Sequence, residues 1–177
     1  MKVQHLIVSL LASLGCATAS ADNIDPTEAN ARIAQVLTCK RPISPEGFAA
    51  LVKAAHGKAT VQASDLSDAE YTVPNPIDVF GRPVTELSVH SASDGEGDFN
   101  EYTGAFSGES IQTVAKLGDI PKDDIGHYKK AVGNHDLSLR AESGGTYISC
   151  ANDVRTVAKA IKRTARDAAD AVKRVGQ

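Results

Sequence analysis

The chain has 177 residues, of which 42% are hydrophobic and 23% charged, with a net charge of −3 and an isoelectric point near 5.9. These values are typical of a globular protein, and they exclude collagen, a coiled-coil rod, a disordered tail and a disulfide-dense mini-protein. The slight acidic excess argues against nucleic-acid binding, because such proteins carry a surplus of lysine and arginine.

The first 21 residues have the organisation of a secretory signal peptide. Lys2 precedes an apolar run over residues 6–15, and small residues end the segment at Ala21. This order predicts cleavage between Ala21 and Asp22 and a location in the periplasm or outside the cell. The run is shorter than the roughly 20 apolar residues that a membrane-spanning helix needs, so we expect no transmembrane segment.

Cys16 offers a second interpretation of the same segment. Ser13-Leu14-Gly15-Cys16 resembles a lipobox, and cleavage before the cysteine would leave a lipid-anchored amino terminus. Lipoboxes usually have leucine at the position of Ser13. We therefore prefer cleavage at Ala21 and keep a lipoprotein as the alternative.

Removal of residues 1–21 leaves 156 residues, a net charge of −4 and two cysteines, Cys39 and Cys150. The length of residues 22–177 suits a single domain. An even number of cysteines in an exported protein predicts a Cys39–Cys150 disulfide, with two free thiols as the alternative.

Periodicity predicts the elements of the first half. Helices are expected over 26–39 and from Pro45 to about residue 55, since each begins with a capping residue and proline. Alternation over 77–89, with a break at Gly81-Arg82-Pro83, and again around 102–106 predicts two strands joined by a long acidic loop. The prolines of 73–76 argue against a central strand there.

The second half repeats the same order. Helices are predicted over 110–117 and 121–132, a hairpin over 137–141 and 147–150, and a helix of about 20 residues from Asp153. The order αα-ββ-αα-ββ-α predicts an α+β protein whose antiparallel sheet has helices packed on one face.

Charge is divided unevenly along the chain. Basic residues exceed acidic ones by four over 151–177, whereas acidic residues exceed basic ones by eight over 22–150. The basic segment either pairs with the acidic remainder of the domain or lies on an anionic membrane. Its alanine-rich apolar seam favours the first interpretation, because interfacial helices insert tryptophan, phenylalanine or leucine.

Motifs for metal, cofactor or catalysis are not found. The spacing of histidines and cysteines fits no zinc motif, and Ser107 comes one residue too late for Gly-x-Ser-x-Gly. The acidic run from Asp94 fails as an EF-hand, because Phe99 stands where glycine is required and Ala105 where glutamate is required. We therefore predict no catalytic residue, cofactor or metal, with a looser cation site in the acidic run as an alternative.

The acidic run is instead the predicted partner-binding site. Four carboxylates, those of Asp94, Glu96, Asp98 and Glu101, are expected at a hairpin tip, where they suit attraction to a basic cleft. We predict an exported, non-enzymatic binding protein that inhibits a protein partner such as a toxin or a cell-wall hydrolase. The alternatives are a small-ligand-binding or structural envelope protein, and a hydrolase whose serine, histidine and aspartate are dispersed in sequence.

Overall fold

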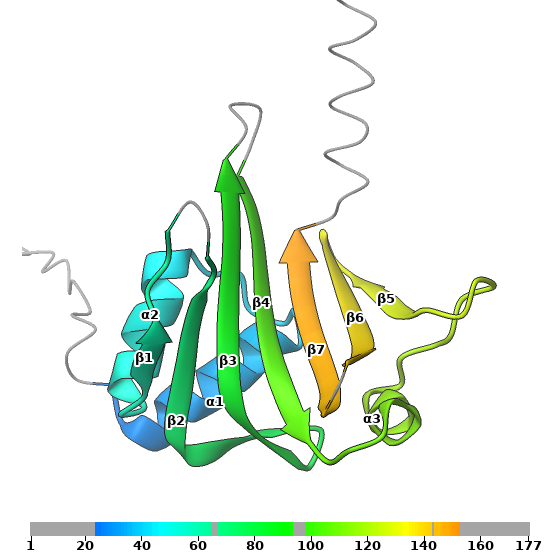
Figure 1. The fold of residues 1–177 in the computed structure, drawn as a ribbon, viewed down its shortest axis with the longest axis horizontal. Coiled ribbons are helices and arrows are strands. Elements are labelled where there is room, and N and C mark those ends of the chain that lie inside the picture. Colours follow the sequence, from blue (N-terminus) through cyan, green and yellow to red (C-terminus); the bar gives the residue numbers. More distant parts are fainter. Residues whose placement is uncertain (1–23, 65–66, 94–97, 143, 153–177) are drawn as a thin grey trace, which may run out of the picture.

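The computed structural model describes residues 24–64, 67–93, 98–142 and 144–152 (Figure 1). The predicted signal peptide, most of the acidic run and the predicted helix from Asp153 lie outside these ranges. The described elements are α1 (Pro26–Leu37), α2 (Pro45–Ala54), β1 (Lys58–Val61), β2 (Ala69–Val79), β3 (Arg82–Ser93), β4 (Asp98–Ser107), α3 (Ile111–Gly118), β5 (Tyr128–Val132), β6 (His135–Glu142) and β7 (Gly145–Asn152).

The strands form one antiparallel sheet in the order β1-β2-β3-β4-β7-β6-β5. Figure 1 shows α1 and α2 behind this sheet, and α1 contacts β2, β4 and β7. The smaller α3 packs against β6 and β7. The predicted α+β class and antiparallel sheet are confirmed, whereas the described order is αα-ββββ-α-βββ and not αα-ββ-αα-ββ.

Both amino-terminal helices begin at the predicted caps. The carboxylate of Asp25 accepts a hydrogen bond from the Thr27 amide at 2.8 Å, and the hydroxyl of Ser44 accepts one from the Gly47 amide at 3.2 Å. Each side chain satisfies an amide that has no partner in the first helical turn. The capping signals in the sequence therefore placed both starts correctly.

Residues 73–76, whose prolines argue against a central strand, have no register partner in either neighbouring strand of the described sheet. Strand β2 runs through this segment, and Val73 is buried in the core. The register with β3 shifts between Thr72 and Ile77, so the two prolines fall within an irregularity of the ladder. A bulge of this kind tolerates residues that cannot donate a ladder hydrogen bond.

A single strand over 77–89 is wrong, because the chain reverses there into the β2–β3 hairpin. Phe80 and Gly81 have φ values of 57° and 75°, and Val79 pairs with Arg82. Positive φ at both loop residues is the type I′ geometry that matches the twist of antiparallel strands. The Asp78 carboxylate accepts a hydrogen bond from the Gly81 amide at 2.8 Å, which holds the turn.

The predicted helix over 121–132 is a loop followed by β5. The Asp123 carboxylate accepts hydrogen bonds from the amides of Ile125 and His127, and Gly126 has a φ of 94°. Proline and aspartate favour turns as well as helix starts, so the sequence pattern did not separate the two. The predicted hairpin over 137–150 corresponds to β6 and β7.

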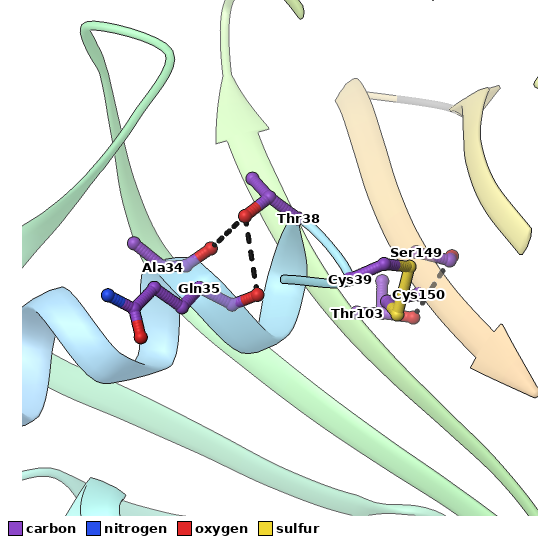
Figure 2. Close-up of a disulfide and its surroundings, with 7 residues drawn as sticks. All are labelled: Ala34, Gln35, Thr38, Cys39, Thr103, Ser149 and Cys150. Atoms are coloured by element: carbon purple, nitrogen blue, oxygen red, sulfur yellow. Dashed lines mark hydrogen bonds between the residues drawn. A yellow bond between two sulfur atoms is a disulfide. The ribbon is translucent and has the colours of Figure 1, made fainter. Parts of the chain in front are cut away.

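The predicted disulfide is confirmed. Cys39 and Cys150 are bridged with a Cα–Cα distance of 5.4 Å, and both are buried (Figure 2). Tyr102 lies opposite Cys150 in the β4–β7 register, and its hydroxyl donates a hydrogen bond to the Ile43 carbonyl at 2.6 Å. Two contacts therefore tie the α1–α2 connection to the centre of the sheet.

Removing the bridge should lower stability strongly. The cysteines are 111 residues apart, and chain entropy predicts that the double variant Cys39→Ala/Cys150→Ala loses up to about 4–5 kcal/mol of unfolding free energy. Denaturant titration measures this loss. Reducing agent should destabilise the wild type and leave the variant unchanged, and equal wild-type stability with and without reductant would contradict the prediction.

Tyr102 should contribute a pH-dependent part of the stability. Burial, with a smaller effect of Glu46, raises the pKa of Tyr102 to about 12. Its contribution is therefore complete below the ordinary tyrosine pKa of 10 and is lost as the pH rises from 10 towards 12. At neutral pH, Tyr102→Phe should cost about 1–2 kcal/mol, because the Ile43 carbonyl loses its donor. Denaturant unfolding between pH 7 and 11.5 should show a shallower alkaline loss for the variant than for the wild type.

Candidate functional site: the open face of the sheet

One face of the sheet has no helix over it within the described ranges (Figure 1). The alternation of side chains along each strand shows which residues belong to this face. Gly104 lies on the helical side, since a Cβ there would come within 2.9 Å of the Leu37 side chain. Thr103 and Ala105 consequently point to the opposite side. We call this side the open face.

A row of four hydroxyl side chains crosses the middle of the open face. Register partners on β3, β4, β7 and β6 supply Ser88, Thr103, Ser149 and Ser138. Thr103 and Ser149 have exposed fractions of only 5% and 1%, and their hydroxyl oxygens lie 3.2 Å apart (Figure 2). These small side chains therefore lie low on the face and leave space between the longer ones beside them.

A hollow of about 400 Å³ lies over this part of the sheet. Thr103 and Ala105 line it from β4, and Tyr147 from β7, while Glu70 and Glu86 line it from β2 and β3. Its size falls in the range of ligand sites, but its walls carry hydroxyl and carboxylate groups, unlike the mostly apolar walls of small-molecule pockets.

The two glutamates of this hollow are diagonal neighbours on adjacent strands. Glu70 pairs in register with Ser88, and Glu86 with Thr72. Both side chains are exposed, and neither makes an ion pair with any other described residue. Like charges at this separation repel each other, so the pair attracts a cation; the basic residue nearest to it in the register is Lys58 on β1, the partner of Thr72.

On the part of the open face formed by β4, β7 and β6, acidic and basic side chains neutralise each other. Arg140 on β6 lies 3.8 Å from a carboxylate oxygen of Glu101 and 3.0 Å from one of Glu142. Its guanidinium also lies 5.7 Å from the centre of the Tyr147 ring. Free negative charge on this face is thus found at Glu70 and Glu86.

The predicted acidic site falls only in part on the described residues. Glu101 lies within β4 on the open face, and Asp98 is the first residue of that strand. Asp94 and Glu96 lie outside the described ranges. Sequence reasoning missed Glu70 and Glu86, although Glu70 stands between Ala69 and Tyr71 and Glu86 precedes the alternating Leu87 and Val89, positions typical of exposed strand residues.

A second hollow, of about 980 Å³, lies between the amino end of α2 and strands β2 and β3. Its lining includes a contact between His90 Nδ1 and Asp68 at 2.6 Å, together with Ser64 and Ser67. The ring of Phe99 packs edge-on against His90. A histidine and a carboxylate that meet near serines are the arrangement expected of a hydrolase with a dispersed site.

Within the described part of the chain, no three histidine, cysteine or acidic side chains are grouped to hold a metal ion. None of the described helices has the length and hydropathy to cross a membrane. Comparison of the chain with protein-family models, with curated proteins and with solved structures gave no match.

Glu70 and Glu86 should be dispensable for folding. The double variant Glu70→Gln/Glu86→Gln removes a repulsion and breaks no described ion pair, so we expect its unfolding free energy to stay within about 0.5 kcal/mol of the wild type. Denaturant titration at low ionic strength measures the difference. A loss above about 1 kcal/mol would assign the glutamates a structural role.

Proposed function

We propose that the protein is an exported, non-enzymatic binding protein that holds a basic protein partner against the open face and thereby blocks it. The partner is a toxin or a cell-wall hydrolase. The observation that carries this proposal is the exposed pair Glu70 and Glu86 beside a floor of small hydroxyl residues. A cationic projection of the partner would enter the hollow and pair with both carboxylates.

The rigidity of the surface supports this function. The open face belongs to the strands that the Cys39–Cys150 bridge ties to α1. Binding to a surface that is already ordered loses little conformational entropy, so more of the contact energy contributes to affinity.

The charge distribution supports a basic partner. Acidic residues exceed basic ones by eight over residues 22–150, and Asp94 and Glu96 belong to this acidic part of the sequence. The acidic excess of this part of the chain adds to the negative charge of Glu70 and Glu86. A negative field accelerates the encounter with a cationic protein and makes the rate depend on salt.

Export is part of the proposal. A buried disulfide persists in an oxidising compartment, which agrees with the predicted signal peptide and cleavage between Ala21 and Asp22. We therefore place the interaction in the periplasm or outside the cell.

A cationic lysozyme is a suitable probe, because it is a basic cell-wall hydrolase. Surface plasmon resonance with the protein purified after expression of the full chain should show binding. Glu70→Gln/Glu86→Gln should lower the association rate about 3–10-fold at low salt and flatten its salt dependence, since the loss concerns steering. Cell-wall turbidity assays should show matching loss of inhibition.

The control is Glu28→Gln/Glu46→Gln, which removes the same charge from the helical layer. It should retain the wild-type association rate. If both double variants slow association equally, the effect comes from net charge and not from the open face. If the wild type does not bind lysozyme, the assignment to this class of partner is contradicted.

The Asp68–His90 contact favours a hydrolase as a second candidate function. In that case His90 acts as a base that Asp68 orients, and a serine of the same hollow acts as the nucleophile. Hydrolysis of a p-nitrophenyl ester should then be abolished in His90→Ala. Equal hydrolysis by the variant and the wild type rejects this candidate.

A further inference from the structure

The connection between α3 and β5 holds a large apolar side chain in solvent. Ile125 is 77% exposed, whereas Leu117, the other exposed large hydrophobic residue in the described chain, is 46% exposed at the end of α3. Figure 1 shows this connection extending away from the sheet beyond β5. We call residues 119–127 the α3–β5 loop.

Hydrogen bonds around Asp123 fix the tip of this loop. Its carboxylate accepts from the amide of Ile125 at 3.1 Å and from the amide of His127 at 2.7 Å. Its own amide donates to the His127 carbonyl at 2.7 Å, and its carbonyl accepts from the Gly126 amide at 3.0 Å. The amide donors hold the pKa of the Asp123 carboxyl below its ordinary value, so the brace stays ionised at neutral pH.

The base of the loop is fixed as well. The Lys129 amide donates to the Pro121 carbonyl at 3.1 Å, and Lys122 forms an isolated bridge with Tyr128. Lys130 reaches back to the Asp119 carboxylate at 3.2 Å. The loop is therefore ordered at both its base and its tip, although Ile125 itself packs against little of the protein.

This combination is typical of a binding loop. An ordered loop presents an apolar group without an ordering cost at the moment of binding. Asp124, the neighbour of Ile125, is exposed and makes no ion pair with the other described residues. An apolar tip beside a free carboxylate fits an apolar pocket whose rim carries lysine or arginine.

We propose that the α3–β5 loop is a second contact for the basic partner, in which Ile125 fills an apolar pocket and Asp124 pairs with a cation at its rim. This inference rests on the proposed function. Strand spacing places β5 about 19 Å from β3. Glu70 on β2 lies one strand farther and the loop extends beyond β5, so a partner that reaches both contacts needs an interface at least as wide as the roughly 30 Å of a standard one of about 800 Å² per partner.

The test uses the same lysozyme probe. Ile125→Ala should weaken binding about 10–100-fold, mainly through faster dissociation, because a side chain that leaves a filled pocket changes the lifetime of the complex more than the encounter. Asp124→Asn should weaken it less. Leu117→Ala is the matched control, since it removes an exposed apolar side chain from α3, and it should bind like the wild type.

The variant Asp123→Ala distinguishes the effect of loop order from the effect of the Ile125 contact. This variant keeps Ile125 and loses the brace, so we expect weaker binding than the wild type and higher amide exchange at Ile125 and His127. Equal affinities of the wild type and Ile125→Ala would overturn the role of the loop. If Glu70→Gln/Glu86→Gln still slows association in that case, the open-face proposal stands, whereas a wild type that does not bind contradicts both.

Discussion

The Cys39–Cys150 bridge is the constraint on which the arrangement of layers depends. Cys39 lies two residues after the end of α1, and Cys150 lies in β7, which pairs with both β4 and β6. The bridge therefore holds the end of α1 against the middle of the sheet. The Tyr102 hydroxyl binds the carbonyl of Ile43 from the neighbouring strand position, so the start of α2 is held on the same side. With both helices fixed there, the opposite face is left to polar residues.

The candidate site lies directly behind this constrained point. Ser149 precedes Cys150 on β7 and Thr103 follows Tyr102 on β4, and consecutive strand residues point to opposite faces. The contacts that fix the helical layer thus also fix Thr103, which lines the hollow, and its neighbour Ser149. A surface whose backbone is held from behind keeps its charges in place, which suits recognition of a partner better than a flexible acidic tail does.

The sequence predicted correctly the features that depend on interactions between residues close together in the chain, such as the starts of the first two helices. Asp25 and Ser44 marked helix starts because their side chains bond to amides two or three residues away. The prolines of 73–76 indicated an interruption of the ladder, but the continuation of β2 through it with a shifted register depends on pairing with β3, which local signals do not reveal. The helix predicted over 121–132 failed because Asp123 suits a helix start and a turn equally, and pairing of β5 with β6 decides between them.

The candidate site was less predictable, because free charge is a property of the folded surface. The sequence draws attention to Asp94, Glu96, Asp98 and Glu101, which are close together along the chain. In the fold, Arg140 reaches Glu101 across β7, although 39 positions separate the two residues. Glu70 and Glu86 lie in different strands, and only the β2–β3 register makes them neighbours. Composition therefore indicates an acidic body, while strand register determines which of its carboxylates remain available to a partner.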